Sequence, residues 1–372
     1  MPTEADIAAL TARVLWAGFG LGVAFGAVAR RTHFCTMGAI SDIVASGDWA
    51  RMRMWLLAIG TAMLGFNAMV AAGWVQAGHS IYAAPRLAWL AHAVGGLMFG
   101  FGMVLASGCG SRNLVRAGGG NLKSWVVLLV LAAAAYATLR GIAGVLRVAS
   151  VERVTLALPA GQDLPSLAAQ ASGWPRGVLA LVFGIGLGGA LIAGVLARKQ
   201  GRSGDVLLGG FGIGAVVVGT WWVSGVLGHV AEHPATLEES FVGTASRRME
   251  SLTFVAPLAN TLDWLILFSD ASRVLNLGIV TSAGVLLGAA LVALADGSFR
   301  WEGFGGVEDT ANHLVGAVLM GVGGVTALGC TIGQGISGLS TLALGSFIAF
   351  GAIVAGGWLG VRWQIRRIER GA

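Results

Sequence analysis

The chain has 372 residues, of which 56% are hydrophobic and 11% are charged, and its mean hydropathy is +0.78. A soluble protein of this length presents far more polar surface to water, so the composition excludes a soluble domain and predicts an integral membrane protein in a lipid bilayer. The formal charge of +6 does not indicate nucleic acid, because arginines in cytoplasmic loops account for such an excess in membrane proteins. We therefore expect no nucleic-acid partner.

The predicted elements are apolar helices that begin close to the N-terminus. The opening residues MPTEAD include no basic residue, and the apolar run behind them is long and has no convincing cleavage site, so we expect no removable signal peptide. A helix that crosses a hydrocarbon layer of roughly 30 Å needs about 20 residues. Nine stretches are expected to cross the membrane, at approximately 8–29, 54–77, 87–108, 124–146, 177–197, 206–228, 274–295, 312–329 and 341–363.

A short apolar segment lies between the first two spans. The stretch RTHFCTMGAISDIVASGD (31–48) is bounded by arginines at its start and contains Cys35. It is too short to cross a bilayer and too apolar to be an ordinary solvated loop. We expect it to enter the membrane as a short re-entrant helix and to return on the same side.

The segments that follow the third and eighth spans are alike. VLASGCGSRN (104–113) contains Cys109, and VTALGCTIGQ (325–334) contains Cys330. Both are too rich in Gly and small polar residues for a lipid-facing helix, and irregular backbone at membrane depth is tolerated only where protein or a water-filled cavity covers it. The sequence therefore predicts an interrupted helix at each of these two cysteines.

The chain also repeats itself at a constant shift of 221 residues. HAVGGLMFGFGMVLASGC (92–109) and HLVGAVLMGVGGVTALGC (313–330) agree at nine of 18 positions, and the agreement ends on the two cysteines. Each repeat holds four spans, and one further span lies between the repeats. Four spans return the chain to the face from which it started, and the single extra span takes it across once more. The second repeat therefore starts from the opposite face of the membrane.

This arithmetic predicts the fold class. We expect an all-α integral membrane protein of about nine transmembrane helices in two inverted repeats (4+1+4), with short re-entrant helices. The first repeat covers 1–146, a connecting loop and the linking helix cover 147–204, and the second repeat with a C-terminal tail covers 205–372. In transporters with inverted repeats the substrate site lies between the repeats and is formed by interrupted helices.

The distribution of basic residues predicts the orientation. With the N-terminus periplasmic and the C-terminus cytoplasmic, most Lys and Arg fall on the cytoplasmic side, as the positive-inside rule requires. Most of the others lie in the long loops 147–176 and 230–273, where that rule is weak. The cytoplasmic group comprises Arg30, Arg31, Arg51, Arg53, Arg112, Arg116, Lys123, Arg198, Lys199, Arg202, Arg300, Arg362, Arg366, Arg367 and Arg370.

Three cysteines are present, Cys35, Cys109 and Cys330, and none belongs to a CxxC pair. We therefore expect no disulfide framework, no metal site and no cofactor. A lone Cys in an apolar segment is most often a small buried hydrophobe, but the shared setting of Cys109 and Cys330 favours a functional role. The amides of Asn113 and Gln334 and the guanidinium of Arg112 are candidates to contact an anion. Alternatively, Arg112 only anchors the cytoplasmic side. The other candidate pathway residues are Thr36, Gly108, Gly110, Arg112, Asn113, Gly329, Thr331 and Gln334.

The cysteine motifs resemble a known family. HFCTMGAISD, FGFGMVLASGCGSRNLVR and GVGGVTALGCTIGQGISGLS are similar to segments of the YeeE/YedE family of bacterial inner-membrane proteins, and the resemblance covers nearly the whole chain. It implies an hourglass-shaped bundle of inverted repeats with short helices that enter from both faces. Because the studied members take up thiosulfate, the resemblance implies a thiosulfate transporter of the inner membrane.

The same resemblance implies roles for individual residues. Cys35, Cys109 and Cys330 would pass the anion along by S–H hydrogen bonds, and inverted symmetry calls for a fourth cysteine near Val255 or Ala256, where the chain has none. Family members are often encoded with a TusA-like sulfurtransferase. We therefore expect such a partner at the cytoplasmic face, where the C-terminal RWQIRRIER offers a basic surface.

Several functions fit these motifs. A dianion in a low-dielectric pathway needs weak donors at several sites, because a fixed central cation would bind it too tightly for release. Protonated thiols and helix N-termini are such donors. This favours a transporter of thiosulfate and not an enzyme. The alternatives are a transporter of sulfite, sulfide or selenite, and a membrane sulfurtransferase in which Cys109 is a thiolate nucleophile beside Arg112.

Overall fold

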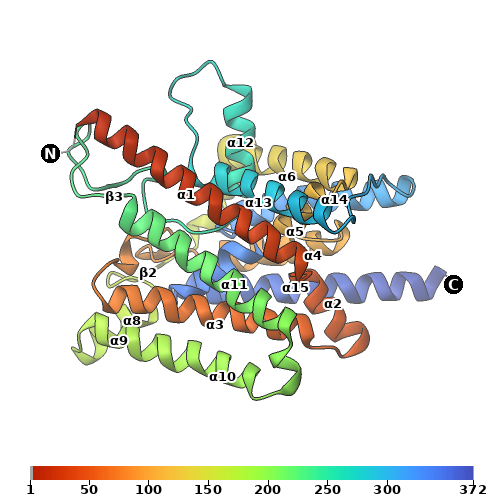
Figure 1. Cartoon of the computed structure of the whole chain (residues 1–372), viewed down its shortest axis with the longest axis horizontal. Helices are drawn as coiled ribbons and strands as arrows, with labels where there is room; N and C mark the ends of the chain where they lie inside the picture. The colour runs from red at the N-terminus through yellow and green to blue at the C-terminus, as the bar shows by residue number, and fades with distance from the viewer. Residues whose placement is uncertain (1–2, 372) are drawn as a thin grey trace.

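A computed structural model describes residues 3–371 of the chain. It is a bundle of long helices that lie roughly along one direction, with α1 beginning at one end and α15 ending at the other (Figure 1). The helices are α1 (Glu4–Arg31), α2 (Thr36–Ser46), α3 (Ala50–Ala71), α4 (Trp89–Leu105), α5 (Gly110–Gly118), α6 (Leu122–Arg140), α7 (Ile142–Ala149), α8 (Leu164–Ser172), α9 (Arg176–Phe183), α10 (Ala190–Leu196), α11 (Gly204–Trp222), α12 (Ala256–Ile266), α13 (Leu277–Ala295), α14 (Val307–Thr326) and α15 (Leu344–Gly371).

Short elements connect these helices. Three are π-helical stretches, η3 (Gly184–Gly189), η5 (Val223–Leu227) and η6 (Gly333–Gly338), and three are single 3₁₀ turns, η1 (Ala77–His79), η2 (Val151–Arg153) and η4 (Lys199–Arg202). Two small antiparallel ribbons lie in the long loops, β1 (Arg86–Leu87) with β2 (Leu156–Ala157) and β3 (His229–Val230) with β4 (Ser240–Phe241).

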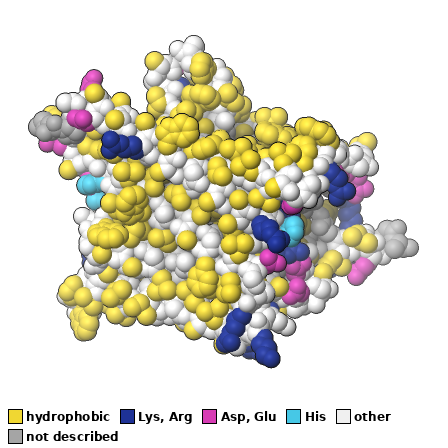
Figure 2. Space-filling model, viewed as in Figure 1, with side chains coloured by type: hydrophobic (Ala, Val, Ile, Leu, Met, Phe, Trp, Pro, Cys, Tyr) yellow, Lys and Arg dark blue, Asp and Glu magenta, His cyan; other side chains and the backbone are white. Residues whose placement is uncertain are grey.

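The chain is an all-α multi-pass membrane protein. Within the described residues, eight helical stretches are long and apolar enough to cross a membrane, and they run through α1–α2, α3, α4–α5, α6, α9–α10, α11–η5, α13 and α15. The ninth predicted span, 312–329, overlaps α14 (Val307–Thr326), which is not among these eight stretches and whose first turn carries Glu308 and Asp309. Hydrophobic side chains cover much of the visible face, while Lys and Arg gather toward the end at which α1 finishes (Figure 2).

Glycines bring α4 and α14 into close contact at the centre of the bundle. A Cβ at Gly95 would lie 2.7 Å from the carbonyl oxygen of Gly323, and a Cβ at Gly102 would lie 2.7 Å from that of Gly316. Only glycine allows the two backbones to approach this closely. Because the earlier glycine of α4 meets the later glycine of α14, the two helices run antiparallel.

The packing partners of the two halves correspond. Helix α1 packs against α13 and α11 packs against α3, while α4 packs against α15 and α14 packs against α6. The short helices follow the same rule, since α2 packs against α15 and α12 packs against α6. Helices α2 and α12 are each 11 residues long. The linking stretch α9–η3–α10 lies against α3 and has no counterpart in this scheme.

Candidate functional site

Each of the three cysteines lies at the N-terminal end of a short helix. Cys35 is the N-cap of α2 and Cys109 is the N-cap of α5. Cys330 directly precedes the helical segment 331–340, which contains η6. All three are buried, with 5%, 1% and 0% of their surfaces exposed. A helix N-terminus offers unpaired N–H groups and a partial positive charge, which suit an anion.

Left-handed backbone turns create the interruptions before Cys109 and Cys330. After α4 the φ angle is +53° at Ser107 and +158° at Gly108, and after α14 it is +60° at Leu328. Glycine is needed at the second of these positions because residues with a Cβ rarely adopt that conformation. The interrupted helices predicted from the sequence are therefore present at both cysteines.

The predicted amides hold these interruptions in place. Asn113 Nδ2 donates to the carbonyl oxygens of Gly108, at 2.9 Å, and Cys109, at 3.1 Å. Gln334 Nε2 donates to the carbonyl of Ala327, at 2.5 Å. Both amide groups thus bind carbonyls of the interrupted segment, and their contact with an anion stays a prediction.

The sulfur atoms differ in their partners. Cys35 Sγ accepts the Gly38 N–H at 3.3 Å, and Cys330 Sγ accepts the Gly333 N–H at 3.4 Å. The Cys109 sulfur lies 3.2 Å from the Ser111 hydroxyl, and either atom can donate. A thiol that accepts an N–H from its own helix keeps its S–H hydrogen for another partner. Sequence reasoning missed Ser111, although it directly follows the GCG motif.

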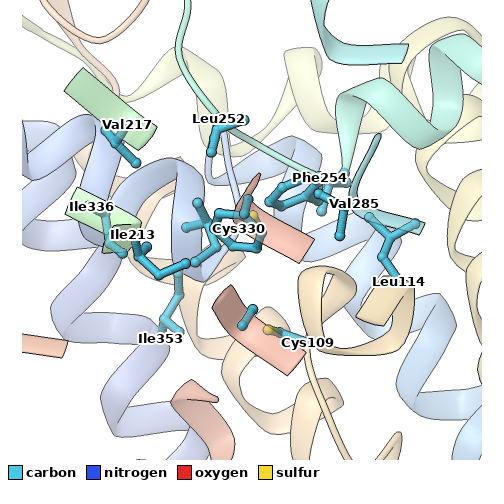
Figure 3. Close-up of a cluster of buried hydrophobic side chains, with 14 of the residues drawn as sticks. Cys109, Leu114, Ile213, Val217, Leu252, Phe254, Val285, Cys330, Ile336 and Ile353 are labelled. Carbon is cyan, nitrogen blue, oxygen red and sulfur yellow. The ribbon is translucent and has the colours of Figure 1, made fainter. Parts of the chain in front are cut away.

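The cysteines lie close to one another in the interior. Cys109 and Cys330 belong to one buried cluster, in which Phe254 lies beside Cys330 (Figure 3). Cys109 is near enough to interact electrostatically with both Cys330 and Cys35. The structure therefore brings together the three cysteines that the sequence singled out, since both Cys35 and Cys330 lie near Cys109.

Buried hydroxyls accompany two of the cysteines. Thr36 directly follows Cys35 and Thr331 directly follows Cys330. The exposed fractions of these two threonines are 2% and 0%. Neither hydroxyl has a hydrogen-bond partner within the described residues. A buried polar group without a partner costs about 1–3 kcal/mol, so the structure retains polar groups here that a ligand can satisfy.

Arg112 supplies a positive charge at one end of this cluster. Its guanidinium is close enough to act electrostatically on Cys35 and on His33, and its side chain runs past Gly108. Arg116, one turn further along α5, instead donates to the Ser107 carbonyl at 3.2 Å. Arg116 thus holds the interrupted backbone, and both arginines lie near enough to Cys35 to act on it electrostatically.

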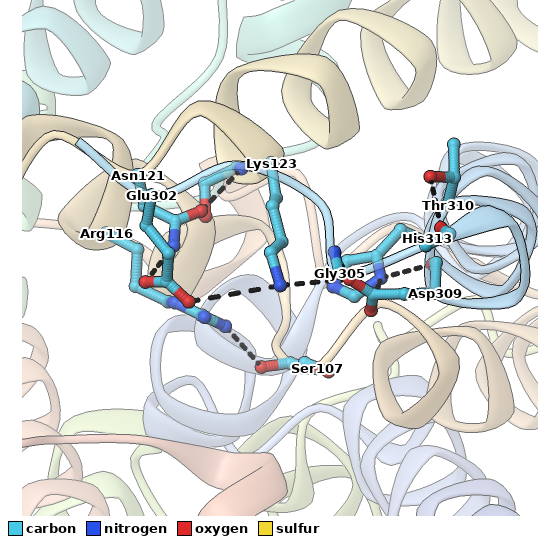
Figure 4. A network of polar contacts seen from close by, with 11 residues as sticks. Ser107, Arg116, Asn121, Lys123, Glu302, Gly305, Asp309, Thr310 and His313 are labelled. Carbon is cyan, nitrogen blue, oxygen red and sulfur yellow. Dashed lines mark hydrogen bonds and ion pairs between the residues drawn. The ribbon is translucent and has the colours of Figure 1, made fainter.

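A polar network anchors the same region from outside. Lys123 Nζ lies 2.9 Å from Asp309 Oδ2, and Asn121 Nδ2 donates to Glu302 Oε2 at 2.7 Å (Figure 4). These contacts join the start of α6 to the loop before α14 and to the first turn of α14. Together with the Arg116 contact, they fix the interrupted segment between α4 and α5 against its neighbours.

Val255 lies where the expected inverted repeat would place a fourth cysteine. It is the N-cap of α12, as Cys35 is the N-cap of α2, and it is 1% exposed. A hydroxyl lies nearby, because Thr253 Oγ1 is 3.9 Å from Cys330 Sγ. Sequence reasoning missed Thr253, since it belongs to a long loop without a motif.

A membrane-embedded bundle whose interrupted helices meet in its interior has the architecture of a transporter. A family model for sulphur transport matches residues 31–359. The chain therefore belongs to this sulphur transport family, and the resemblance to YeeE/YedE proteins is confirmed.

Named relatives extend over almost the entire chain. The thiosulfate transporter TsuA of Escherichia coli (strain K12) is 27% identical over 353 residues, which cover 93% of each chain. TsuA of Spirochaeta thermophila is 26% identical over 360 residues, which cover 93% of this chain and 97% of that protein. The probable transporter YedE of Salmonella typhimurium is 31% identical over 108 residues, which cover 28% and 25% of the two chains.

Proposed function

We propose that this protein imports thiosulfate across the bacterial inner membrane through a pathway lined by Cys35, Cys109 and Cys330, without acting as an enzyme. The observation that carries the proposal is the meeting of three buried cysteines at the N-termini of short helices. The identity to proteins named thiosulfate transporters over 93% of the chain supports the choice of substrate.

The proposed pathway is built from two inverted repeats. The antiparallel crossing of α4 and α14 and the matching packing partners of the two halves support this arrangement. The first repeat comprises 1–146, the linking part 147–204, and the second repeat 205–372. With a periplasmic N-terminus and a cytoplasmic C-terminus, Cys330 lies on the periplasmic side of Cys109.

The proposed transport depends on uncharged hydrogen-bond donors that follow one another along the pathway. The anion meets Cys330, then Cys109, then Cys35, and each thiol offers one S–H while the adjacent helix offers N–H groups. Weak donors at several positions allow both entry and release, as conduction requires. Arg112 then attracts the anion toward the cytoplasmic exit. Because the cysteines are buried, passage requires the surrounding side chains to move aside.

A cytoplasmic partner follows from the same orientation. The C-terminal part of α15 carries Arg362, Arg366 and Arg370, and Arg367 is paired with Glu308 at 2.9 Å. This basic end of α15 is proposed to bind a small TusA-like sulfurtransferase that receives the imported sulfur. Binding through such a surface weakens with salt.

Uptake of labelled thiosulfate in a bacterial strain without its own sulfur importers tests the proposal. We expect uptake of thiosulfate that excess sulfate does not abolish. Sulfite and selenite serve as competing substrates, and preference for either would replace thiosulfate as the cargo. Mass spectrometry of the thiosulfate-treated protein adds a second arm, because a persulfide on Cys109 would indicate the sulfurtransferase alternative and contradict a simple conduit.

A further inference from the structure

Two hydroxyl groups from distant loops meet at the helix that follows Cys330. Tyr82 lies in the loop between α3 and α4, is 2% exposed, and its hydroxyl has no hydrogen-bond partner within residues 3–371. Thr253 lies in the loop before α12, is partly exposed, and its Oγ1 is 3.9 Å from Cys330 Sγ. Neither residue belongs to a cysteine motif.

Gly333 shows that these hydroxyls occupy one small space. A Cβ at Gly333 would lie 2.6 Å from Thr253 Oγ1 and 3.3 Å from the Tyr82 hydroxyl. The backbone N–H of Gly333 points at Cys330 Sγ, 3.4 Å away. Two hydroxyls, one thiol and the first turn of a helix therefore converge on a single point.

The opposite half of the chain has a charge in the corresponding position. At the shift of 221 residues that aligns Cys109 with Cys330, Gly333 corresponds to Arg112. Arg112 has a guanidinium that acts electrostatically on Cys35, whereas glycine at 333 leaves room for the hydroxyls of Tyr82 and Thr253. The helix after Cys330 thus begins beside two hydroxyl donors where the helix after Cys109 carries a cation, and the Glu250 carboxyl is near enough to act electrostatically on Tyr82.

The position of the Tyr82 ring is fixed by its neighbours. The ring packs edge-on against Trp221, with 6.2 Å between the ring centroids, and Trp221 Nε1 in turn donates to Ser340 Oγ at 3.0 Å. Burial raises the pKa of Tyr82 well above its usual range, so the phenol stays protonated. Its hydroxyl is a permanent donor that already points at the helix start.

We infer that Tyr82 and Thr253 form, together with Cys330, an outer subsite that binds the oxygen atoms of a tetrahedral sulfur oxyanion before it reaches Cys109. Hydroxyl groups are stronger donors to oxygen than thiols are, so Tyr82 and Thr253 bind the oxygens while Cys330 faces the terminal sulfur. The neutral character of the subsite keeps binding weak on the entry side. This inference rests on the proposed function and deepens it.

The test compares hydroxyl-removing variants of the full-length protein. Tyr82→Phe and Thr253→Val keep the shapes of the two side chains and remove one donor each. Calorimetric titration with sodium thiosulfate should show a Kd about five- to tenfold higher for each variant. Thr253→Ser keeps the hydroxyl, so this variant should bind thiosulfate as tightly as the wild type does. Tyr136→Phe is the matched control, because Tyr136 is the other tyrosine of the chain and lies on α6 with its hydroxyl beside Asp263.

Thermal unfolding separates a binding role from a structural one. Within the described part of the chain the Tyr82 hydroxyl has no hydrogen-bond partner, so its removal should leave the melting temperature of the anion-free protein unchanged or raised. A raised Kd with an unchanged or raised melting temperature supports the subsite. An unchanged Kd, or a loss of binding that appears only together with a lower melting temperature, overturns it. Failure of the wild type to bind thiosulfate would instead overturn the proposed function itself.

Discussion

Cys109 differs from the other two cysteines in what its sulfur contacts. The sulfurs of Cys35 and Cys330 accept N–H groups from the first turns of their own helices, whereas the Cys109 sulfur faces the Ser111 hydroxyl. Cys109 thus has a neighbour that can donate to it or accept from it. In the proposed pathway, such an adaptable hydrogen bond suits a thiol that takes an anion from one side and gives it to the other.

Substitution of the cysteines should separate these roles. We expect Cys109→Ala and Cys330→Ala to reduce thiosulfate uptake strongly, because each change leaves the desolvated anion without a donor at a cost of about 1–3 kcal/mol. Ser at either position should keep part of the activity, since O–H still donates. Cys35→Ala should be milder, because its counterpart Val255 offers no donor either. Uptake rates normalised to the amount of protein in the membrane provide the measurement.

Wild-type uptake by both Ala variants, at normal expression, would show that Cys109 and Cys330 are packing residues.

The sequence was sufficient to find these cysteines, because a repeated motif surrounds them. It was not sufficient to find Tyr82 or Thr253, since each reaches Cys330 from a loop that is remote in sequence. The only sequence signal at Tyr82 was the rarity of tyrosine, with 2 in the whole chain.

At the scale of elements, hydropathy predicted where long helices occur but not how they begin and end. The span expected at 54–77 is α3, which ends at Ala71, and the span expected at 124–146 is α6 followed by the separate helix α7. The π-helical stretches η3, η5 and η6 left no hydropathy signal, because they change the hydrogen-bond pattern and not the composition. The repeated segments 92–109 and 313–330 were informative, since their glycines form the contact between α4 and α14.

The contact between α4 and α14 makes a prediction about stability. In Gly102→Ala the new Cβ would lie 2.7 Å from the Gly316 carbonyl oxygen and 2.8 Å from Leu319 Cβ, so the helices must separate. We expect a loss of about 1–3 kcal/mol. Gly20→Ala is the matched control on α1, because nothing lies within 4 Å of its Cβ and alanine favours a helix by about 1 kcal/mol.

Thermal unfolding monitored by size-exclusion chromatography in detergent measures both variants. The Gly102 variant should aggregate at a lower temperature than the wild type, and the Gly20 variant should not. Equal melting behaviour of the two would mean that α4 and α14 are not pressed together, and would remove the structural support for an antiparallel crossing at the centre of the bundle.

At the scale of the whole molecule, the distribution of charge supports the proposed direction. Lys and Arg gather at the end where α1 finishes (Figure 2), and the positive-inside rule predicts that such an end is cytoplasmic. The same end holds Arg112 and the network around Lys123 (Figure 4), while the hydroxyls of Tyr82 and Thr253 lie on the other side of the cysteines. In the proposed orientation, hydroxyl donors beside Cys330 and basic groups at the exit favour inward movement of an anion.

This direction predicts unequal access to the cysteines. With a periplasmic N-terminus, α14 ends toward the periplasm and α4 ends toward the cytoplasm, so a membrane-impermeant maleimide added outside should modify Cys330 faster than Cys109. Thiosulfate should slow the modification of Cys330, because anion and reagent compete for the same thiol. Intact cells expressing variants that retain only Cys330 or only Cys109 allow each rate to be measured separately, and the same variants in inside-out vesicles serve as the control. Faster modification of Cys109 from outside the cells would reverse the orientation and, with it, the proposed order of the pathway.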